Sequence, residues 1–266
     1  MACRFHFKET CLDERLYSLN NVSIYHKLVL CYPPIYCSED ILRKRLNTLR
    51  DFGVEYLVNY GNYNLYEYHV LGKGYSAIVS LCIHEGIPRI LKIRRLDSRR
   101  KGLEAEAVFL EFLEPFELSP KIYSWSKDFI IMEYVDGTPL PNFIENNLNK
   151  IDHVRRVLRK LLVKAFILDS LGIDHGELNR PGSHVMVKGS DIVFLDFESA
   201  SASRKPRNLT SLASYLFLRS RFKEKILCDE YGEDDIISRL RMYKSKISGF
   251  SLRNILKLIK CRNTIS

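Results

Sequence analysis

The sequence predicts an α+β fold in which a small, β-rich part is followed by a helical part of reduced size. After residue 53, short apolar runs rich in Val, Ile and Tyr alternate with glycine-containing turns, a pattern typical of strands. After residue 150, apolar residues instead recur at helical spacing. We therefore expect an N-terminal extension over residues 1–64, a β-rich part over 65–134 and a helical part over 135–266.

The extension contains a well-marked helix. Ser38 is a good N-cap for a helix running to Arg50, and the Asp51-Phe52-Gly53 run is a good end for it. Helical spacing divides its side chains into an inward set, Ile41, Leu42, Leu46 and Leu49, and an outward set, Arg43, Lys44 and Arg45.

Strands are expected directly after this helix. The pattern predicts one strand over 54–58, a turn over 60–62 and further strand over 63–70. A helix followed by a hairpin fits either a small winged-helix-like module or an extension packed on the β-rich part, and we favour packing.

A glycine-rich segment follows, with the pattern G-x-G-x-x-A-x-V. Small residues in such a loop let backbone N–H groups approach a phosphate closely. The candidate nucleotide-binding residues here are Gly72, Lys73, Gly74, Ala77 and Val79. Ala77 stands where a third glycine is usual, and the same pattern also fits an ordinary β-turn.

A lysine and a glutamate follow at suggestive positions. Strand alternation puts Lys92 on the face opposite Leu91 and Ile93. In the helix expected over 103–113, Glu106 shares a face with Leu110 and Leu113, so it is the better placed of two glutamates to pair with Lys92. The alternative is that both charges are solvated.

The run from Phe129 to Gly137 predicts a buried strand that stops at a polar break. If the chain binds a nucleotide, Met132 stands at the back of the base pocket. The backbone of Glu133 to Val135 would then bond the base. A core strand followed by a turn would look the same.

Two stretches in the second half carry the strongest signal. One contains His175-Gly176-Glu177-Leu178, and the other, about twenty residues on, ends in Asp196-Phe197-Glu198. A His-x-acid-Leu turn followed by an apolar strand ending in Asp-Phe is the way in which kinase-like enzymes place a catalytic loop and a metal-binding aspartate. The three earlier features precede these stretches in the same order.

The order of these motifs over residues 71–198 resembles the atypical protein-kinase-like superfamily, most closely the archaeal predicted serine/threonine kinases akin to RIO and Kae1-associated kinases. The resemblance implies a bilobal protein-kinase-like fold with a five-stranded small lobe. It implies phosphoryl transfer from ATP to a protein Ser or Thr, with Mg²⁺ or Mn²⁺ as cofactor. Asp196 would ligate the metal, Lys92 would contact phosphate and be fixed by Glu106, and Glu177 would be the base.

Two positions depart from that superfamily. The loop acid is Glu177 rather than Asp, so its carboxylate lies one methylene further out and requires a compensating backbone. Five residues after the loop acid, where the superfamily has a metal-binding Asn, this sequence has Gly182. If the segment is two residues longer than usual, His184 stands in the place of that Asn. Imidazole suits transition metals better than Mg²⁺, so the second metal is expected to be absent, to be Mn²⁺, or to be held by Asn179. His175 is expected to brace the loop.

These departures leave two other functions open. A nucleotide-binding pseudokinase or ATPase that switches an RNA or protein assembly fits the changes at Ala77, Glu177 and Gly182. A small-molecule kinase also fits, because similar loops occur in aminoglycoside-type phosphotransferases. The protein substrate is not specified by any motif.

A net charge of +9 favours anionic partners, which are ATP and, as further candidates, RNA or a ribosomal particle. One basic group is Arg94, Arg95, Arg99, Arg100 and Lys101. A second group lies on a helix opposite an apolar stripe and contains Arg155, Arg156, Arg159, Lys160 and Lys164. A basic turn over 204–208 is either a solvated loop or a contact for phosphate.

Seven cysteines are scattered without a Cys-x-x-Cys pair, which predicts free thiols in a reducing cytoplasm and no zinc site or disulfide framework. No run of eighteen apolar residues occurs, so no membrane-spanning helix and no membrane partner are expected. The first residues also lack the apolar core of a signal peptide. Residues 209–262 predict two or three helices.

Overall fold

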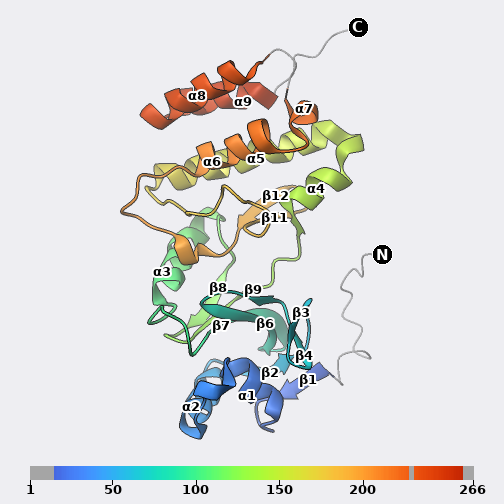
Figure 1. Ribbon diagram of the computed structural model, residues 1–266, viewed down its shortest axis with the longest axis vertical. Helices are drawn as coiled ribbons and strands as arrows, with labels where there is room; N and C mark the ends of the chain where they lie inside the picture. The colour runs from blue at the N-terminus through green and yellow to red at the C-terminus, as the bar shows by residue number, and fades with distance from the viewer. Residues whose placement is uncertain (1–14, 228–230, 260–266) are drawn as a thin grey trace. The chain divides into compact units, whose positions relative to one another are not determined.

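The computed structural model describes residues 15–227 and 231–259 and has an α+β fold with antiparallel sheets (Figure 1). The α+β class predicted from the sequence is confirmed. The chain divides into two compact units. Unit 1 comprises Met1–Glu111 and Lys121–Tyr134, and unit 2 comprises Phe112–Pro120 and Val135–Ser266.

Unit 1 is built on a seven-stranded sheet with the order β1-β2-β6-β7-β9-β8, in which β5 pairs with β6 off this path. The strands are β1 Leu16–Ser18, β2 Val54–Val58, β5 Gly72–Lys73, β6 Ala77–His84, β7 Ile87–Arg94, β8 Ile122–Trp125 and β9 Phe129–Glu133. Five of these strands, β5 to β9, lie within residues 65–134, and the extension adds β1 and β2, of which β2 pairs with β6. The extension is thus continuous with the sheet.

The hairpin in this region is formed by other strands than predicted. Strands β3 Tyr63–Leu65 and β4 Tyr68–Val70 pair with each other, whereas β2 pairs with β1 and β6. The tight turn lies at Tyr66, which has a φ of 59°, and not at residues 60–62. The strand structure predicted over 63–70 is therefore present as two short strands, β3 and β4.

Two helices of the extension, α1 Ile24–Leu30 and α2 Glu39–Asp51, contribute to the core of unit 1. The Ser38 hydroxyl accepts a hydrogen bond from Ile41 N at 3.2 Å, which confirms the predicted N-cap. Leu46 and Leu49 are buried against residues of the sheet, as predicted. The unit also holds α3, Glu104–Leu113, which runs on into unit 2, and the 3₁₀ helix Pro34–Tyr36.

Arg45 corrects the expectation of an outward side chain. It is buried, lies 3.1 Å from Asp128 Oδ1, donates to Leu30 O and faces the Phe129 ring. A buried guanidinium is stable only with such partners, because it gives up its hydration on folding. Asp128 lies 83 residues later in the chain, so helical spacing alone could not reveal it.

Cys31 and Cys37 are joined by a disulfide, which corrects the prediction that all cysteines are free thiols. Their Cα atoms lie 5.5 Å apart across the short turn between α1 and α2. Cys82 is a free, buried thiol, and burial raises its pKa to about 12. Cys3, Cys11, Cys228 and Cys261 lie outside the described residues.

Unit 2 combines a three-stranded sheet with a layer of helices. Its strands, in sheet order, are β10 Thr138–Pro139, β11 Val185–Lys188 and β12 Asp191–Phe194. Its helices are α4 Leu140–Asn146, α5 Ile151–Ser170, α6 Asn208–Ser214, α7 Lys223–Ile226, α8 Glu233–Ser245 and α9 Gly249–Leu256. A π-helical segment covers Tyr215–Arg219, and 3₁₀ turns cover Glu114–Phe116, Leu148–Lys150, Phe197–Ser199 and Lys257–Ile259.

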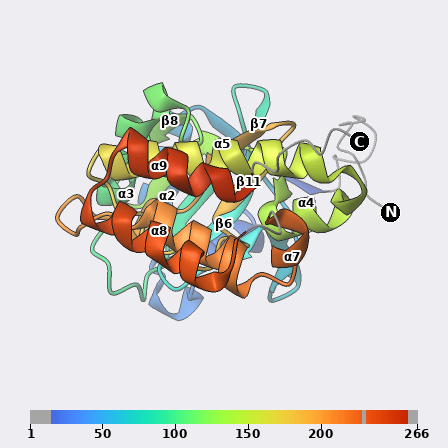
Figure 2. The same cartoon turned by 90° about the horizontal axis from the view of Figure 1, so that it is seen from above.

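Helix α5 is the long central helix of unit 2, and α8 and α9 run side by side near it (Figure 2). Its predicted apolar stripe, from Val154 to Ala165, is fully buried. The C-terminal part is more broken than the two or three helices expected, because a π-helical segment and the short α7 interrupt it. No helix among residues 15–227 and 231–259 is long and apolar enough to cross a membrane.

The basic face predicted on α5 is largely engaged within the chain. Arg155 donates to the carbonyls of Lys225, Ile226 and Leu227 at the end of α7. Arg159 donates to Leu256 O at the end of α9. Lys164 Nζ contacts Asp191 and the carbonyls of Glu117 and Ile192 at 2.7 to 3.1 Å. Arg155 and Arg159 thereby satisfy carbonyls that helix ends leave without partners.

Candidate functional site

In unit 1, the glycine-rich segment forms the tip of the hairpin between β5 and β6. Gly72 pairs with Val79 and Lys73 with Ile78, and Gly74 N donates to Ala77 O at 2.8 Å to close the loop. Ala77 is buried in the core, which explains a methyl group at this position. Tyr75 at the tip is 92% exposed. Residues 73–75 are therefore the exposed tip of this loop.

The extension contacts this loop through Tyr32, which no sequence pattern indicated. Lys73 Nζ lies 4.6 Å from the centre of the Tyr32 ring, and Arg95 lies 5.0 Å from it. Arg95 also donates to Gly74 O at 2.8 Å and pairs with Asp97. One aromatic ring thus links the extension to two cations that flank the loop.

Lys92 and Glu106 form a buried ion pair, as their spacing predicted. Lys92 Nζ lies 2.8 Å from Oε1 and 2.7 Å from Oε2 of Glu106, and the side chains are only 5% and 4% exposed. On β7, Lys92 lies opposite Val79 of β6 and Ile130 of β9, so it occupies the centre of the sheet. The contact to both carboxylate oxygens fixes the ammonium in one orientation.

The end of β9 carries the residues expected at a base pocket. Met132 pairs with Ile90 and Ile122 and is half-buried. Glu133 N donates to Lys121 O at 2.7 Å, so this amide is engaged within unit 1. Val135 is buried and is the first residue of this stretch to fall in unit 2.

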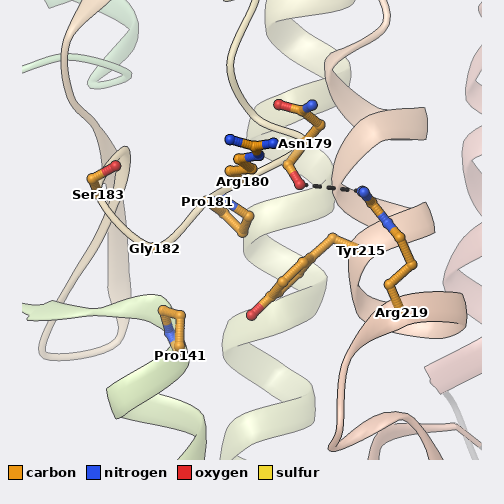
Figure 3. A pocket seen from close by; sticks show the side chains of 8 residues that line it. All are labelled: Pro141, Asn179, Arg180, Pro181, Gly182, Ser183, Tyr215 and Arg219. Carbon is orange, nitrogen blue, oxygen red and sulfur yellow. Dashed lines mark hydrogen bonds between the residues drawn. The ribbon is translucent and has the colours of Figure 1, made fainter.

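Unit 2 contains a pocket of about 490 Å³ that sequence reasoning missed (Figure 3). Its lining comes from the loop after Glu177, from the start of α4 and from the π-helical segment, and it consists of Pro141, Asn179, Arg180, Pro181, Gly182, Ser183, Tyr215 and Arg219. The residues come from distant parts of the sequence, so no local pattern could have indicated it.

His175 braces the loop that carries the candidate base, as expected. It is fully buried, and its Nε2 lies 3.0 Å from Leu195 O. Its backbone N donates to Asn208 Oδ1 at 2.9 Å. Burial, which disfavours the charged imidazole, lowers the pKa of His175 to about 4. The neutral ring therefore donates from Nε2 to the Leu195 carbonyl.

The turn after His175 requires glycine. Gly176 has a φ of +92°, and a Cβ there would lie 2.8 Å from Ser199 O. Arg204 packs over this turn, donating to Asp174 Oδ2 at 2.9 Å and to Ser199 O at 2.6 Å. Arg204 of the predicted basic turn therefore pairs with a buried carboxylate of its own chain.

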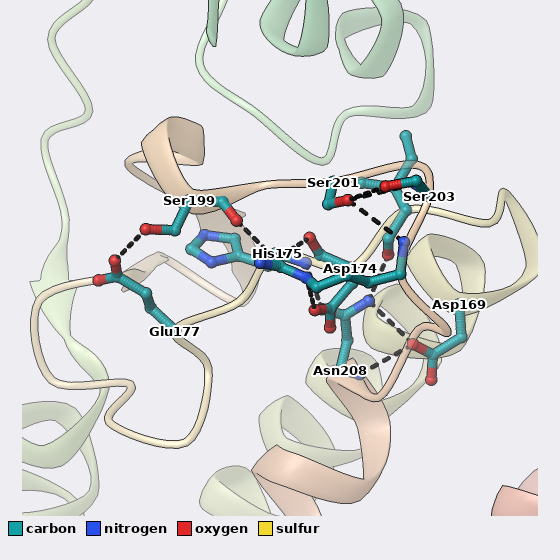
Figure 4. Close-up of polar contacts among 10 residues, drawn as sticks. Asp169, Asp174, His175, Glu177, Ser199, Ser201, Ser203 and Asn208 are labelled. Carbon is teal, nitrogen blue, oxygen red and sulfur yellow. Dashed lines mark hydrogen bonds and ion pairs between the residues drawn. The ribbon is translucent and has the colours of Figure 1, made fainter. Parts of the chain in front are cut away.

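Glu177 is held at both carboxylate oxygens. Oε1 accepts a hydrogen bond from the Ser199 hydroxyl at 2.5 Å (Figure 4), and Oε2 lies 2.9 Å from Nε2 of His184. His184, predicted as a metal ligand, thus has the loop acid as its partner. Ser199 was missed from sequence, because a serine in a polar turn carries no distinguishing pattern.

Asp196 lies two residues after the end of β12, at a strained point of the backbone. Its φ of 64° is in the left-handed region, which is unusual for a residue other than glycine. The preceding Leu195 is tied at both backbone groups, since its N donates to His184 O and its O accepts from His175. The His-x-Glu loop and the Asp-Phe stretch are therefore connected through Leu195.

A buried polar network around Asp169 and Asn208 holds the loop that contains His175 (Figure 4). Asp169 of α5 accepts hydrogen bonds from Asn208 N and Nδ2, Leu209 N and the Tyr243 hydroxyl at 2.8 to 3.1 Å. Burial raises the pKa of Asp169, and the four hydrogen bonds oppose that shift. Asn208 in turn contacts His175 N, so α5, α6 and α8 together fix the position of His175.

No protein-family model matches this chain. The chain is 30% identical over 95 residues to an uncharacterized protein of Methanocaldococcus jannaschii. The match covers 36% of this chain and 79% of the archaeal protein.

Proposed function

We propose that this chain, which belongs to the same family as the uncharacterized protein of Methanocaldococcus jannaschii, is an ATP-dependent phosphotransferase, and specifically an atypical serine/threonine protein kinase. The single observation that carries the proposal is the buried pair of Lys92 and Glu106. A buried ion pair is often no more stabilising than two apolar residues of similar size. Its position behind a glycine-rich hairpin therefore favours a role for the ammonium, and that role is contact with phosphate.

The residues of unit 1 fit a nucleotide. The exposed, glycine-containing tip at residues 73–75 suits close approach of phosphate oxygens, and Lys92 supplies a fixed positive charge. Adenine would be bound by the chain at Met132 to Val135, with the Glu133 N–H excluded as a donor because Lys121 O accepts from it. ATP would supply the phosphoryl group that is transferred.

The residues of unit 2 fit the acceptor side of the reaction. Asp196 offers carboxylate oxygens of the kind that Mg²⁺ and Mn²⁺ prefer, and such an ion would neutralise phosphate charge. Glu177 is the base that accepts the proton of the acceptor hydroxyl. Its two contacts, to Ser199 and His184, hold the carboxylate in place, which compensates for the longer Glu side chain. We assign His184 to this positioning role in preference to metal ligation.

We further propose that units 1 and 2 correspond to the two lobes of a bilobal protein-kinase-like fold. The support is the order of features along the chain. The glycine-rich hairpin, Lys92 and Glu106 lie in unit 1, and the loop of Glu177 and Asp196 lies in unit 2. The chain passes between the units after Tyr134, where the adenine-binding segment is expected.

The test is transfer of γ-phosphate from labelled ATP in the presence of Mg²⁺ or Mn²⁺. Wild type is expected to label itself or a protein acceptor, and Asp196→Asn and Lys92→Ala are expected to lose that labelling. The Lys101→Ala variant changes an exposed lysine of unit 1 and is the matched control. Binding of ATP without transfer to any hydroxyl would overturn the kinase assignment.

One observation favours a second function, a nucleotide-dependent switch for an RNA or protein assembly. Both carboxylate oxygens of Glu177 are engaged by Ser199 and His184, so an acceptor hydroxyl would have to share an oxygen that already has a partner. In this alternative, ATP hydrolysis drives a change of assembly partner. Hydrolysis of ATP by the wild type without phosphoprotein formation is the result that would favour it.

A further inference from the structure

We propose that the pocket of unit 2 binds an acidic residue of the acceptor polypeptide, so that the enzyme selects a Ser or Thr close to a carboxylate or a phosphorylated residue. This inference rests on the proposed kinase function and specifies its substrate class. Its starting point is the placement of the pocket, whose lining begins only two residues after Glu177 (Figure 3).

The charge of the pocket indicates an anionic ligand. Arg180 and Arg219 line it, and none of the lining residues is acidic. The Arg219 guanidinium donates to Asn179 O at 3.1 Å, a neutral partner. Among residues 15–227 and 231–259, no hydrogen bond or ion pair involves the Arg180 side chain, which is exposed. A guanidinium fork matches a carboxylate or phosphate group in geometry as well as in charge.

The remaining lining suits a polypeptide. The rings of Pro141, Pro181 and Tyr215 give apolar walls against which a main chain can pack. Burial raises the pKa of Tyr215, so its hydroxyl stays protonated and remains a hydrogen-bond donor near neutral pH. A volume of about 490 Å³ accommodates one long side chain with its neighbouring backbone.

The turn after Glu177 sets the spacing between the acidic residue and the acceptor hydroxyl. Arg180 N donates to Glu177 O at 3.0 Å, so these residues are the ends of a turn. Their Cα atoms then lie within about 7 Å of each other. An extended peptide advances about 3.3 Å per residue. With the reach of the Arg side chain, the acidic residue is expected about two to four positions from the Ser or Thr.

The experiment measures binding by fluorescence anisotropy with the full chain. The probe is a labelled peptide with one Ser and Glu at the third position on each side, compared with a peptide that carries Gln instead. Wild type is expected to bind the Glu peptide at least about tenfold more tightly, and Arg180→Gln to lose that preference. The control is Arg156→Gln, which removes an exposed arginine of α5 in the same unit and is expected to bind as wild type does.

Two further arms identify the source of the anion. A peptide with phosphoserine in place of Glu tests whether phosphate is preferred to carboxylate, and binding of either in an Arg180-dependent way supports the proposal. A single-stranded RNA oligonucleotide is the third probe. Arg180-dependent binding of RNA, with no preference between the Glu and Gln peptides, would overturn it in favour of a nucleic-acid site.

Transfer assays separate failure of this inference from failure of the proposed function. If wild type phosphorylates the Glu and Gln peptides with equal kcat/KM, the kinase assignment stands and the acidic pocket is wrong. If it binds the Glu peptide through Arg180 but transfers no phosphate to any peptide, the pocket stands as an acidic-peptide site and the kinase assignment fails.

Discussion

The Nε2 atom of His184 lies 2.9 Å from Oε2 of Glu177, so a histidine in the place of an expected metal-binding Asn contacts the loop acid. His184 is buried at the start of β11, whereas the Glu177 side chain is 42% exposed. The buried ring is the fixed member of the pair, and the glutamate is the member that solvent and an acceptor can reach. The pair therefore suits a positioned base whose second partner, Ser199, is also in the loop region.

Glu177 is expected to be required for transfer and not for nucleotide binding. Glu177→Gln keeps the size and shape of the side chain, but it replaces one acceptor oxygen with an NH2 donor and removes the carboxylate that could accept a proton. The expected result is a fall in kcat of about a hundredfold or more, with little change in the Kd for ATP. The matched control is Glu117→Gln, which changes an exposed glutamate of the same unit whose contacts among the described residues involve only its backbone. Transfer by Glu177→Gln at the wild-type rate would show that Glu177 is not the base.

His184 is expected to act through Glu177. In His184→Phe the ring is kept and the contact to the carboxylate is lost, so Glu177 becomes less well positioned. We expect kcat to fall by roughly ten- to a hundredfold, with unchanged KM for ATP. If His184 were instead a metal ligand, the same variant would raise the concentration of Mn²⁺ needed for half-maximal transfer. Steady-state kinetics across a range of Mn²⁺ concentration distinguishes the two roles.

The pair of Lys92 and Glu106 allows a thermodynamic prediction. Lys92→Met removes the ammonium that contacts both oxygens of the buried Glu106 carboxylate, which is expected to lower the free energy of unfolding by about 3 to 5 kcal/mol. The double variant Lys92→Met with Glu106→Leu removes both charges and is expected to recover most of that loss while remaining inactive. Chemical denaturation of the wild type, the two single variants and the double variant gives the coupling energy between the two side chains. Additive losses would mean that the pair is not a coupled unit.

Gly176 and Gly172 form a natural comparison in the same loop. Both have positive φ, at +92° and +76°, but only at Gly176 would a Cβ meet backbone, at 2.8 Å from Ser199 O. Gly172→Ala is expected to cost about 1 kcal/mol of stability from backbone strain alone. Gly176→Ala is expected to cost more and to displace Glu177, so transfer is lost as well. Equal thermal stability and equal activity of the two variants would contradict this account.

His175 predicts how stability depends on pH. The folded-state pKa is about 4, whereas an unfolded histidine has a pKa near 6.5, so between these values the unfolded chain binds more protons. Stability is therefore fully present above the unfolded value and falls as the pH drops toward the folded value. The loss from this residue is expected to be about 2 kcal/mol between pH 7 and pH 5. Denaturation curves of wild type and His175→Gln should differ by that amount in their pH dependence, with the variant less sensitive.

Local sequence patterns were sufficient to predict features whose interacting residues lie near one another in the sequence. The cap at Ser38 and the buried face of α2 follow from spacing along one helix, and the pairing of Lys92 with Glu106 follows from alternation along one strand and spacing along the next helix. The sequence did not reveal the burial of Arg45, because its partner Asp128 lies in a distant turn. It predicted the strand over 54–58 but not its pairing with β6, since strand pairing partners are set by the whole sheet.

In the candidate site, too, features within one contiguous motif could be predicted and contacts between distant segments could not. The loop acid, the bracing role of His175 and the Asp-Phe stretch could be identified from motifs, because each motif is contiguous in sequence. The contacts of Glu177 to His184 and Ser199 could not, since they depend on how three segments of the loop region fold back on one another. The basic residues of α5 were read as a surface for anions, and their carbonyl partners lie about 30 to 100 residues away.

The hydrogen bonds from α5 to these carbonyls also affect how unit 2 unfolds locally. Through Arg155, Arg159 and Lys164, α5 holds the ends of α7 and α9 and the chain at β12. Elements tied to one helix in this way are expected to lose their protection against amide hydrogen exchange together and not one after another. The slowest-exchanging amides of the unit should then lie on α5, and loss of α9 should accelerate exchange as far away as β12.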